Sequence, residues 1–151
     1  MTTELILENE SETLSIGRQI AERLRKGDKI ALSGTLGAGK TTFARGVLEG
    51  LGFSAEVPSP TFAIVQQYDP PEVTLSLAHV DLYRIENGEE ISELGLDENL
   101  IDGAMIVEWP DRMPDRFWDE ALQLQLEIIA DGNRRLTWTA GTAWKGRWPP
   151  Q

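Results

Sequence analysis

The stretch SGTLGAGKTT, residues 33–42, decides the fold of this chain. Gly34, four further residues, Gly39, Lys40 and Thr41 match the pattern G-x-x-x-x-G-K-[ST], whose backbone N–H groups surround the phosphates of a nucleotide. Glycine permits backbone angles and close approaches that a Cβ would prevent, so several N–H groups can point at one anion. The stretch therefore predicts a phosphate-binding loop.

The segments on either side of this loop have the character that the motif requires. DKIALSG, residues 28–34, is a short apolar run suited to a buried strand. TTFARGVLEGLG, residues 41–52, spaces Phe43 and Val47 as a helix does. A helix that starts at the loop directs the positive end of its dipole toward phosphates. The alternative is a glycine-rich turn without a ligand, and the strand, loop and helix order favours a nucleotide site.

Two residues of the loop carry chemistry beyond the backbone. In this motif Lys40 reaches the β- and γ-phosphates, and the hydroxyl of Thr41 is a ligand of Mg²⁺. The loop therefore predicts a nucleoside triphosphate, with Mg²⁺ as its metal ion.

Length and composition limit the possible classes of protein. At 151 residues the chain fits one domain, and it has no run close to the ~20 apolar residues of a membrane span. Residues 1–12 are acidic, whereas a secretory signal is basic and then apolar. The absence of cysteine removes thiolate metal sites and cysteine nucleophiles. These features suit a cytoplasmic protein without a membrane partner.

The charge balance argues against direct binding of nucleic acid. Lysine and arginine number 14 against 25 aspartates and glutamates, which gives a formal net charge of −11. A chain of this charge repels phosphate backbones unless its basic residues cluster, and along the sequence they do not. Any connection to RNA is therefore expected to run through a partner.

The remaining hydrophobic patterns predict an α/β domain. Asn9 and Glu12 indicate a capping box for a helix that ends at Gly27 and turns Leu14, Ile20, Ala21 and Leu24 inward. Residues 87–103 are helical in pattern. Strands are expected at residues 3–8, 28–34, 63–68, 73–83 and 104–109, with a C-terminal hairpin of residues 121–129 and 134–140. The expected sheet mixes buried parallel strands with antiparallel ones.

Two acidic residues that follow apolar strands are candidates for metal and water chemistry. Asp81 follows residues 75–80, placed like the acid that holds Mg²⁺ in other phosphate-loop proteins. Glu108 follows residues 104–107, where a carboxylate can orient or deprotonate an attacking water. For each, the alternative is a strand-end acid that faces solvent. His79 lies on the same strand face as Asp81 and is either structural or a partner of the acids.

Four motifs occur in a characteristic order and spacing: GTLGAGKTT at residues 34–42, SPTF at 59–62, HVDLYR at 79–84 and VEWP at 107–110. Together they resemble the TsaE (YjeE) family of small bacterial P-loop ATPases, over about residues 10–115. The family takes part in making N6-threonylcarbamoyladenosine at position 37 of tRNA. The resemblance implies a three-layer, P-loop NTPase-like domain in which antiparallel strands flank central parallel ones.

The resemblance also implies partners and a role for hydrolysis. TsaD and TsaB form the heterodimer that transfers the threonylcarbamoyl group, and a threonylcarbamoyl-adenylate synthase acts upstream. A TsaE-like protein is expected to bind ATP with Mg²⁺ and to use its hydrolysis to reset the TsaD–TsaB complex between turnovers. Contact with tRNA is then indirect.

The family pattern carries over residue by residue onto this chain. It implies that Lys40, Asp81 and Glu108 act in hydrolysis, and that Thr41, Asp81 and Glu108 lie at the metal. Trp109 lies beside the nucleotide pocket, and Thr61, in a switch loop, senses the γ-phosphate. The residues expected around the phosphates are Gly34, Leu36, Gly37, Ala38, Gly39, Lys40, Thr41 and Thr42.

Two other functions use the same loop. A small-molecule kinase normally has an arginine-rich lid, which is not visible in this sequence. A guanine-specific switch usually has an N-K-x-D string, which does not occur.

The domain is expected to span residues 1–140. Residues 141–151 form a tail with tryptophans and basic residues that either binds a partner, packs on the hairpin or is mobile.

Overall fold

A computed structural model describes residues 3–35, 37–55, 65–85 and 88–148. Leu36 and Thr61, both expected to contact the phosphates, lie outside the described residues, as does the SPTF stretch around Thr61. The longest helix in the described ranges has 12 residues, so none of them is long enough to cross a membrane.

The described strands form one mixed sheet. They are β1 Glu4–Leu7, β2 Lys29–Gly34, β3 Val65–Tyr68, β4 Ser76–Asp81, β5 Gly103–Glu108, β6 Leu122–Ile128 and β7 Arg134–Ala140. Their order in the sheet is β1-β7-β6-β2-β5-β4-β3. The neighbours β6, β2, β5 and β4 run parallel, and antiparallel strands flank them, β3 at one edge and β7 with β1 at the other. The predicted fold class, including the C-terminal hairpin of β6 and β7, is confirmed.

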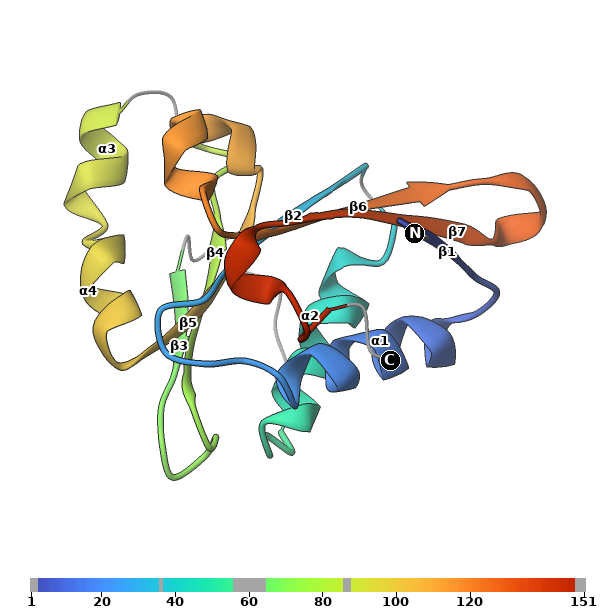
Figure 1. The fold of residues 1–151 in the computed structure, drawn as a ribbon, viewed down its shortest axis with the longest axis horizontal. Helices are drawn as coiled ribbons and strands as arrows, with labels where there is room; N and C mark the ends of the chain where they lie inside the picture. The colour runs from blue at the N-terminus through green and yellow to red at the C-terminus, as the bar shows by residue number, and fades with distance from the viewer. Residues whose placement is uncertain (1–2, 36, 56–64, 86–87, 149–151) are drawn as a thin grey trace.

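Helices cover the two faces of this sheet, as Figure 1 shows. The helices are α1 Glu10–Ala21, α2 Lys40–Gly50, α3 Gly88–Glu93 and α4 Leu96–Asp102. In β2, Ile30 and Leu32 belong to the buried cluster under α1 and α2, whereas Ala31 belongs to a second cluster that includes Leu96 of α4. Because successive residues of a strand point to opposite faces, burial on both faces gives the continuous apolar runs of the central strands.

Several element boundaries differ from the prediction. The helix α1 begins at the predicted cap, where Asn9 accepts a hydrogen bond from the Glu12 N–H at 2.9 Å. It ends at Ala21, not at Gly27, whose positive φ of 90° places it in the turn that leads into β2. The helical segment 87–103 is interrupted at Gly95, which has a φ of 63° and separates α3 from α4.

The segment after residue 140 packs against the rest of the domain in its described part. Trp144 and Trp148 are 1% and 4% exposed, and the Trp148 ring lies 5.6 Å from that of Trp138 on β7. The Arg147 guanidinium forms a buried ion pair with Asp28, at 2.7 Å, just before β2 begins. Residues 141–148 thus complete the core beneath the hairpin.

Close contact between α1 and α2 fixes the position of the helix that follows the phosphate loop. A Cβ at Gly46 of α2 would lie 2.4 Å from the backbone oxygen of Leu14, and a Cβ at Gly17 of α1 would lie 2.5 Å from that of Phe43. Neither backbone can yield as a flexible side chain would. The two glycines therefore let the helices approach to backbone contact.

We expect Gly46→Ala to destabilise the protein although alanine favours helix formation. Overpacking of this kind costs about 1–3 kcal/mol, or about 2–10 °C in Tm for a chain of this size. Thermal unfolding followed by circular dichroism measures the change. Ser11→Ala, at an exposed position of α1, is the control and should leave Tm nearly unchanged. An unchanged Tm for Gly46→Ala would show that α1 and α2 can move apart without loss of stability.

Candidate nucleotide-binding site

The phosphate loop joins the end of β2 at Gly34 to the start of α2 at Lys40. Gly37 and Gly39 have φ angles of 81° and 107°, in the left-handed region that favours glycine. Gly39 is the N-cap of α2, and no side chain caps the helix. The first N–H groups of α2 are therefore available to an anion, and the helix dipole adds to their positive field.

The loop forms one wall of a cleft of about 730 Å³. The opposite wall comes from the ends of β4 and β5. The described residues that line the cleft are Thr35, Gly37, Gly39, Lys40, Thr41, Thr42, Asp81, Tyr83, Glu108 and Trp109. Most of the residues predicted from the motifs thus meet in one space, although they come from three separate parts of the chain.

Two predicted loop residues lie elsewhere. Gly34 does not line this cleft, and a Cβ there would come within 2.7 Å of the backbone oxygen of Leu126 on β6. Glycine at position 34 is therefore required by the close approach of β6. The Ala38 side chain is fully buried in the core.

The two predicted acids are adjacent in the sheet. Asp81 and Glu108 are register partners at the ends of the parallel strands β4 and β5. They are 7% and 5% exposed, so neither is a strand-end acid facing bulk solvent. One oxygen of Asp81 accepts a hydrogen bond from the Tyr83 N–H at 2.9 Å. Both carboxylates are thus held at the cleft wall.

Glu108 has partners at both of its oxygens. The Lys40 Nζ lies 3.7 Å from Oε1 of Glu108, and His79 Nε2 lies 2.8 Å from Oε2. From the sequence, His79 was either a structural residue or a partner of the acids. It is both, because its ring is fully buried and also contacts Glu108. Lysine, carboxylate and imidazole thus form one chain of contacts from the loop to β4.

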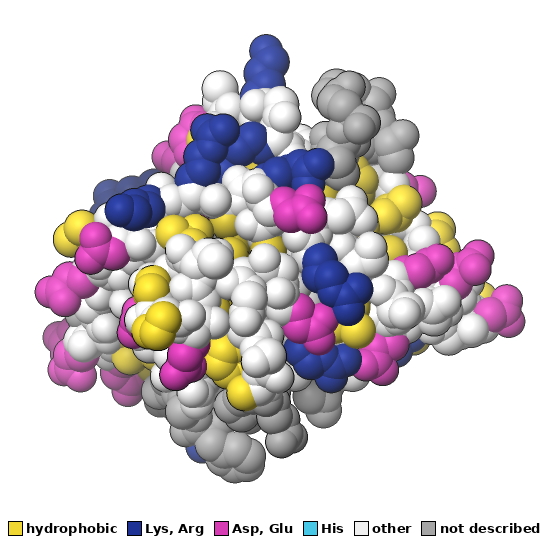
Figure 2. Space-filling view, turned by 90° about the horizontal axis from the view of Figure 1, so that it is seen from below, with side chains coloured by type: hydrophobic (Ala, Val, Ile, Leu, Met, Phe, Trp, Pro, Cys, Tyr) yellow, Lys and Arg dark blue, Asp and Glu magenta, His cyan; other side chains and the backbone are white. Residues whose placement is uncertain are grey.

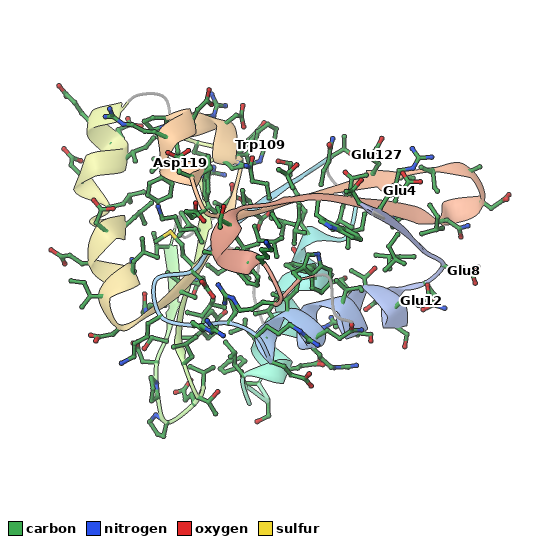
Figure 3. All side chains as sticks on the ribbon, in the orientation of Figure 1. Glu4, Glu8, Glu12, Trp109, Asp119 and Glu127 are labelled. Atoms are coloured by element: carbon green, nitrogen blue, oxygen red, sulfur yellow. The ribbon has the colours of Figure 1, made fainter. Side chains whose placement is uncertain are left out.

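An aromatic pair borders the cleft beside these charges. Trp109, labelled in Figure 3 where it follows β5, lies 5.1 Å from Tyr83 between ring centroids. The Lys40 Nζ is 5.4 Å from the centre of the Trp109 ring. Trp109 has a φ of 60°, uncommon for a residue with a side chain, and such strained backbone is concentrated at functional sites.

A second, smaller pocket of about 270 Å³ lies on the other side of the phosphate loop. It is lined by Gly37 and Thr42 of the loop region and by Asn9 and Thr13 at the start of α1. Arg134, the first residue of β7, completes it. The motifs gave no signal that Asn9, Thr13 and Arg134 would meet the loop here, since these residues are distant in sequence and of common types.

Arg134 also supports the loop itself. Its Nε donates to the Ala38 carbonyl at 3.1 Å and its Nη2 to the Gly37 carbonyl at 3.2 Å. These bonds hold the carbonyl groups of the loop on the side away from the cleft. The start of β7 thus holds the loop by two of its carbonyl groups.

The donor set fits Mg²⁺ with a nucleotide better than a metal ion held by protein alone. No group of three or more His, Cys, Asp or Glu side chains within the described ranges could hold a metal. Mg²⁺ commonly takes only one or two carboxylates, with phosphate and water completing its shell. Thr41, Asp81 and Glu108 supply one hydroxyl and two carboxylates at the wall of the cleft.

Comparison with known protein families finds one match over most of the chain. The family model of "Threonylcarbamoyl adenosine biosynthesis protein TsaE" matches residues 7–136. The tRNA threonylcarbamoyladenosine biosynthesis protein TsaE of Bacillus subtilis is 41% identical over 133 residues, covering 87% of this chain and 82% of that protein. The protein of the same name from Streptomyces coelicolor is 40% identical over 135 residues, and the match covers 85% of this chain and 91% of that protein.

A solved structure shares the fold. The crystal structure of Bacillus subtilis YdiB matches with a TM-score of 0.77 and 33% identity, and the match covers 95% of this chain and 89% of that one.

We expect Arg134→Met to loosen the phosphate loop. Methionine keeps much of the stem but loses both hydrogen bonds to loop carbonyls. Amide exchange at Ala38, whose N–H donates to the Thr35 carbonyl at 3.0 Å, should therefore accelerate on the order of tenfold. Hydrogen exchange followed by mass spectrometry measures this directly.

Arg135→Met is the matched control. Arg135 forms ion pairs with Glu4 and Glu127 at 3.7 Å each, and Figure 3 shows these two acids on the hairpin side of the sheet. Its replacement should leave exchange in the loop unchanged. Equal exchange in wild type and Arg134→Met would show that the loop keeps its shape without Arg134.

Proposed function

Because the chain belongs to the TsaE family of tRNA threonylcarbamoyladenosine biosynthesis proteins, we propose that it is a Mg²⁺-dependent ATPase that drives this modification at position 37 of tRNA. In this proposal the triphosphate of ATP lies in the cleft, and hydrolysis of ATP resets the TsaD–TsaB transferase complex between turnovers. The observation that carries the proposal is the meeting of Lys40, Asp81 and Glu108 in one cleft beside the uncapped start of α2.

Each side chain has a role that follows from its position. The N–H groups at the start of α2 and the Lys40 ammonium bind phosphate oxygens, and Lys40 leaves Glu108 to do so. Thr41 and Asp81 hold the metal, with Glu108 as the third member of the metal set. Bound Mg²⁺ would neutralise charge on the β- and γ-phosphates. Glu108 is also the base that orients the attacking water.

The nucleoside has a place on the other side of the loop. The pocket formed by Asn9, Thr13 and Arg134 is continuous with the loop residues Gly37 and Thr42. We assign the adenosine moiety to this side, because the triphosphate would then run along the loop toward Asp81 and Glu108.

The charges around the site suit control of hydrolysis by a partner. Lys40 is the single cation among the described residues that line the cleft. An arginine supplied by another protein accelerates phosphoryl transfer by about 10³–10⁵ in some P-loop enzymes. We therefore expect slow hydrolysis by the chain alone and faster hydrolysis on docking to TsaD–TsaB, through completion of the site by the partner or through Thr61 as the sensor of the γ-phosphate.

The surface is consistent with indirect contact to tRNA. Basic and acidic side chains are interspersed on the face that Figure 2 shows, and the chain carries a net charge of −11. Phosphate backbones bind strongly only where cations dominate locally. In the proposed cytoplasmic pathway, tRNA is handled by TsaD–TsaB, and the threonylcarbamoyl-adenylate synthase is a functional partner upstream.

We predict that Lys40→Ala weakens ATP binding by about tenfold or more, because a charge-assisted contact to phosphate is lost, and that it abolishes hydrolysis. Calorimetric titration and phosphate release measure the two effects. Lys26→Ala, an exposed lysine in the turn before β2, is the control and should behave as wild type. Unchanged hydrolysis by folded Lys40→Ala would contradict the site. Phosphate transferred to an acceptor, instead of released, would favour the alternative, a small-molecule kinase.

The resetting role predicts a dependence on the partner. Phosphate release should be slow for the chain alone, rise at least tenfold with added TsaD–TsaB heterodimer, and rise less when the chain carries Thr61→Ala. Reconstituted tRNA modification should need this chain for multiple turnovers but not for the first. Fast release by the isolated chain, unaffected by the heterodimer, would contradict the resetting role.

A further inference from the structure

His79 is the only histidine of the chain, and its side chain is fully buried in β4. Its register partner on β5 is Ile106, so it reaches diagonally along the sheet to Glu108, which lies two residues further on. The distance from His79 Nε2 to Glu108 Oε2 is 2.8 Å. Since a carboxylate only accepts hydrogen bonds, the imidazole donates its Nε2–H to Glu108.

The second ring nitrogen of His79, Nδ1, indicates that the hydrogen bond from Nε2 to Glu108 is the reason for a histidine at this position. Nδ1 of His79 is buried and has no hydrogen-bond partner among the residues that the structure describes. A buried polar atom without a partner costs stability, so an aliphatic side chain would suit this place in the core better. Histidine at this position therefore has a purpose other than packing, and the bond to Glu108 supplies one.

Each oxygen of the Glu108 carboxylate has a different partner, one rigid and one flexible. Oε2 faces His79, on a rigid ring buried in the sheet, and Oε1 faces the Lys40 ammonium at 3.7 Å, on a flexible four-carbon stem. When phosphate competes for Lys40, Oε1 loses its partner and meets a group of like charge. Until a metal ion lies between the two groups, repulsion would turn the carboxylate away, unless its other oxygen is held.

We propose that His79 is a positioning residue: its Nε2–H holds Glu108 by one oxygen, so that the other stays directed into the cleft when Lys40 moves to the phosphate. The part that concerns hydrolysis rests on the proposed function above. The hydrogen bond and its persistence do not, and they can be measured separately.

The first experiment tests the bond without any reaction. Because the chain has one histidine, ¹⁵N-labelled imidazole gives a single, unambiguous pair of NMR signals. We expect a proton on Nε2 in wild type, a changed Nε2 shift in Glu108→Gln, and a wild-type signal that persists when Mg²⁺ and adenylyl imidodiphosphate are added. A proton on Nδ1 alone, or loss of the Nε2 bond on adding the nucleotide, would overturn the proposal.

The second experiment tests the consequence for hydrolysis with two variants of His79. His79→Leu removes the donor at similar volume, and we expect kcat for phosphate release to fall about 10–100-fold, as for other residues that orient a ligand, with the affinity for adenylyl imidodiphosphate unchanged. His79→Gln places an amide N–H near the position of Nε2 and should recover part of kcat. A purely structural role predicts equal loss in both variants, tracking Tm.

A double-mutant cycle separates positioning from general damage. In a Glu108→Gln background, His79→Leu should cost little further activity, because the group that it positions is already changed. Leu136→Ala, in the core strand β7, is the control for destabilisation: it should lower Tm without lowering kcat at a temperature where it is folded.

The outcomes distinguish the two proposals. Independent and additive losses for His79→Leu and Glu108→Gln would overturn the positioning role. A wild-type chain that hydrolyses no ATP even with TsaD–TsaB would overturn the proposed function. The NMR result would still decide whether His79 holds Glu108.

Discussion

The parallel pairing of β5 with β2 on one side and β4 on the other is the constraint on which the cleft depends. Parallel strands end at the same edge of a sheet, so Leu32 and Asp81 lie level with Glu108. From that edge β2 continues through the phosphate loop into α2, which brings Lys40 back to Glu108. A shift of one residue in either pairing would turn an acid away from the cleft.

Lys40 and Glu108 form an ion pair in the cleft before any ligand arrives. Lys40 and Glu108 are both nearly buried, and each reduces the cost of burying the other. An anion at the loop must draw Lys40 from this pair, which leaves a carboxylate facing phosphate. A divalent cation makes that arrangement favourable, because it attracts both groups. In the proposed function this geometry would couple the binding of phosphate to that of a metal ion.

The C-terminal part of the chain supports the site from a distance. Arg134 holds two carbonyl groups of the phosphate loop, and Arg147 holds Asp28 just before the strand that leads into it. Both arginines make charge-assisted bonds, which are stronger than bonds between neutral groups, and those between Arg147 and Asp28 are buried. The loop is therefore fixed by residues that contribute nothing to its motif.

Short sequence patterns predicted the structural features that depend on interactions within a few residues. The glycines, Lys40 and the flanking apolar periods predict a strand, a phosphate loop and a helix, because backbone angles, strand burial and helix spacing act over a few residues. Asn9 likewise marked the start of α1 through a contact within one turn. The end of α1 at Ala21 and the break at Gly95 were missed, since packing as well as sequence decides where short helices stop.

Contacts between distant segments were decided only by the tertiary structure. Asp81 and Glu108 were visible as acids that follow apolar strands, but their adjacency depends on strand order, which hydrophobic periodicity does not encode. Arg134 at the phosphate loop and Arg147 at Asp28 left no local trace, because a side chain's type does not say which distant group it will meet. The position of His79 beside Asp81 on its strand marked it as a possible partner of the acids, but only the structure shows that it meets Glu108. The sequence alone determined the kind of loop and the residues able to serve it. Folding determined which of them meet, because hydrogen bonds and ion pairs need atoms a few ångströms apart, and only the packed sheet brings them there.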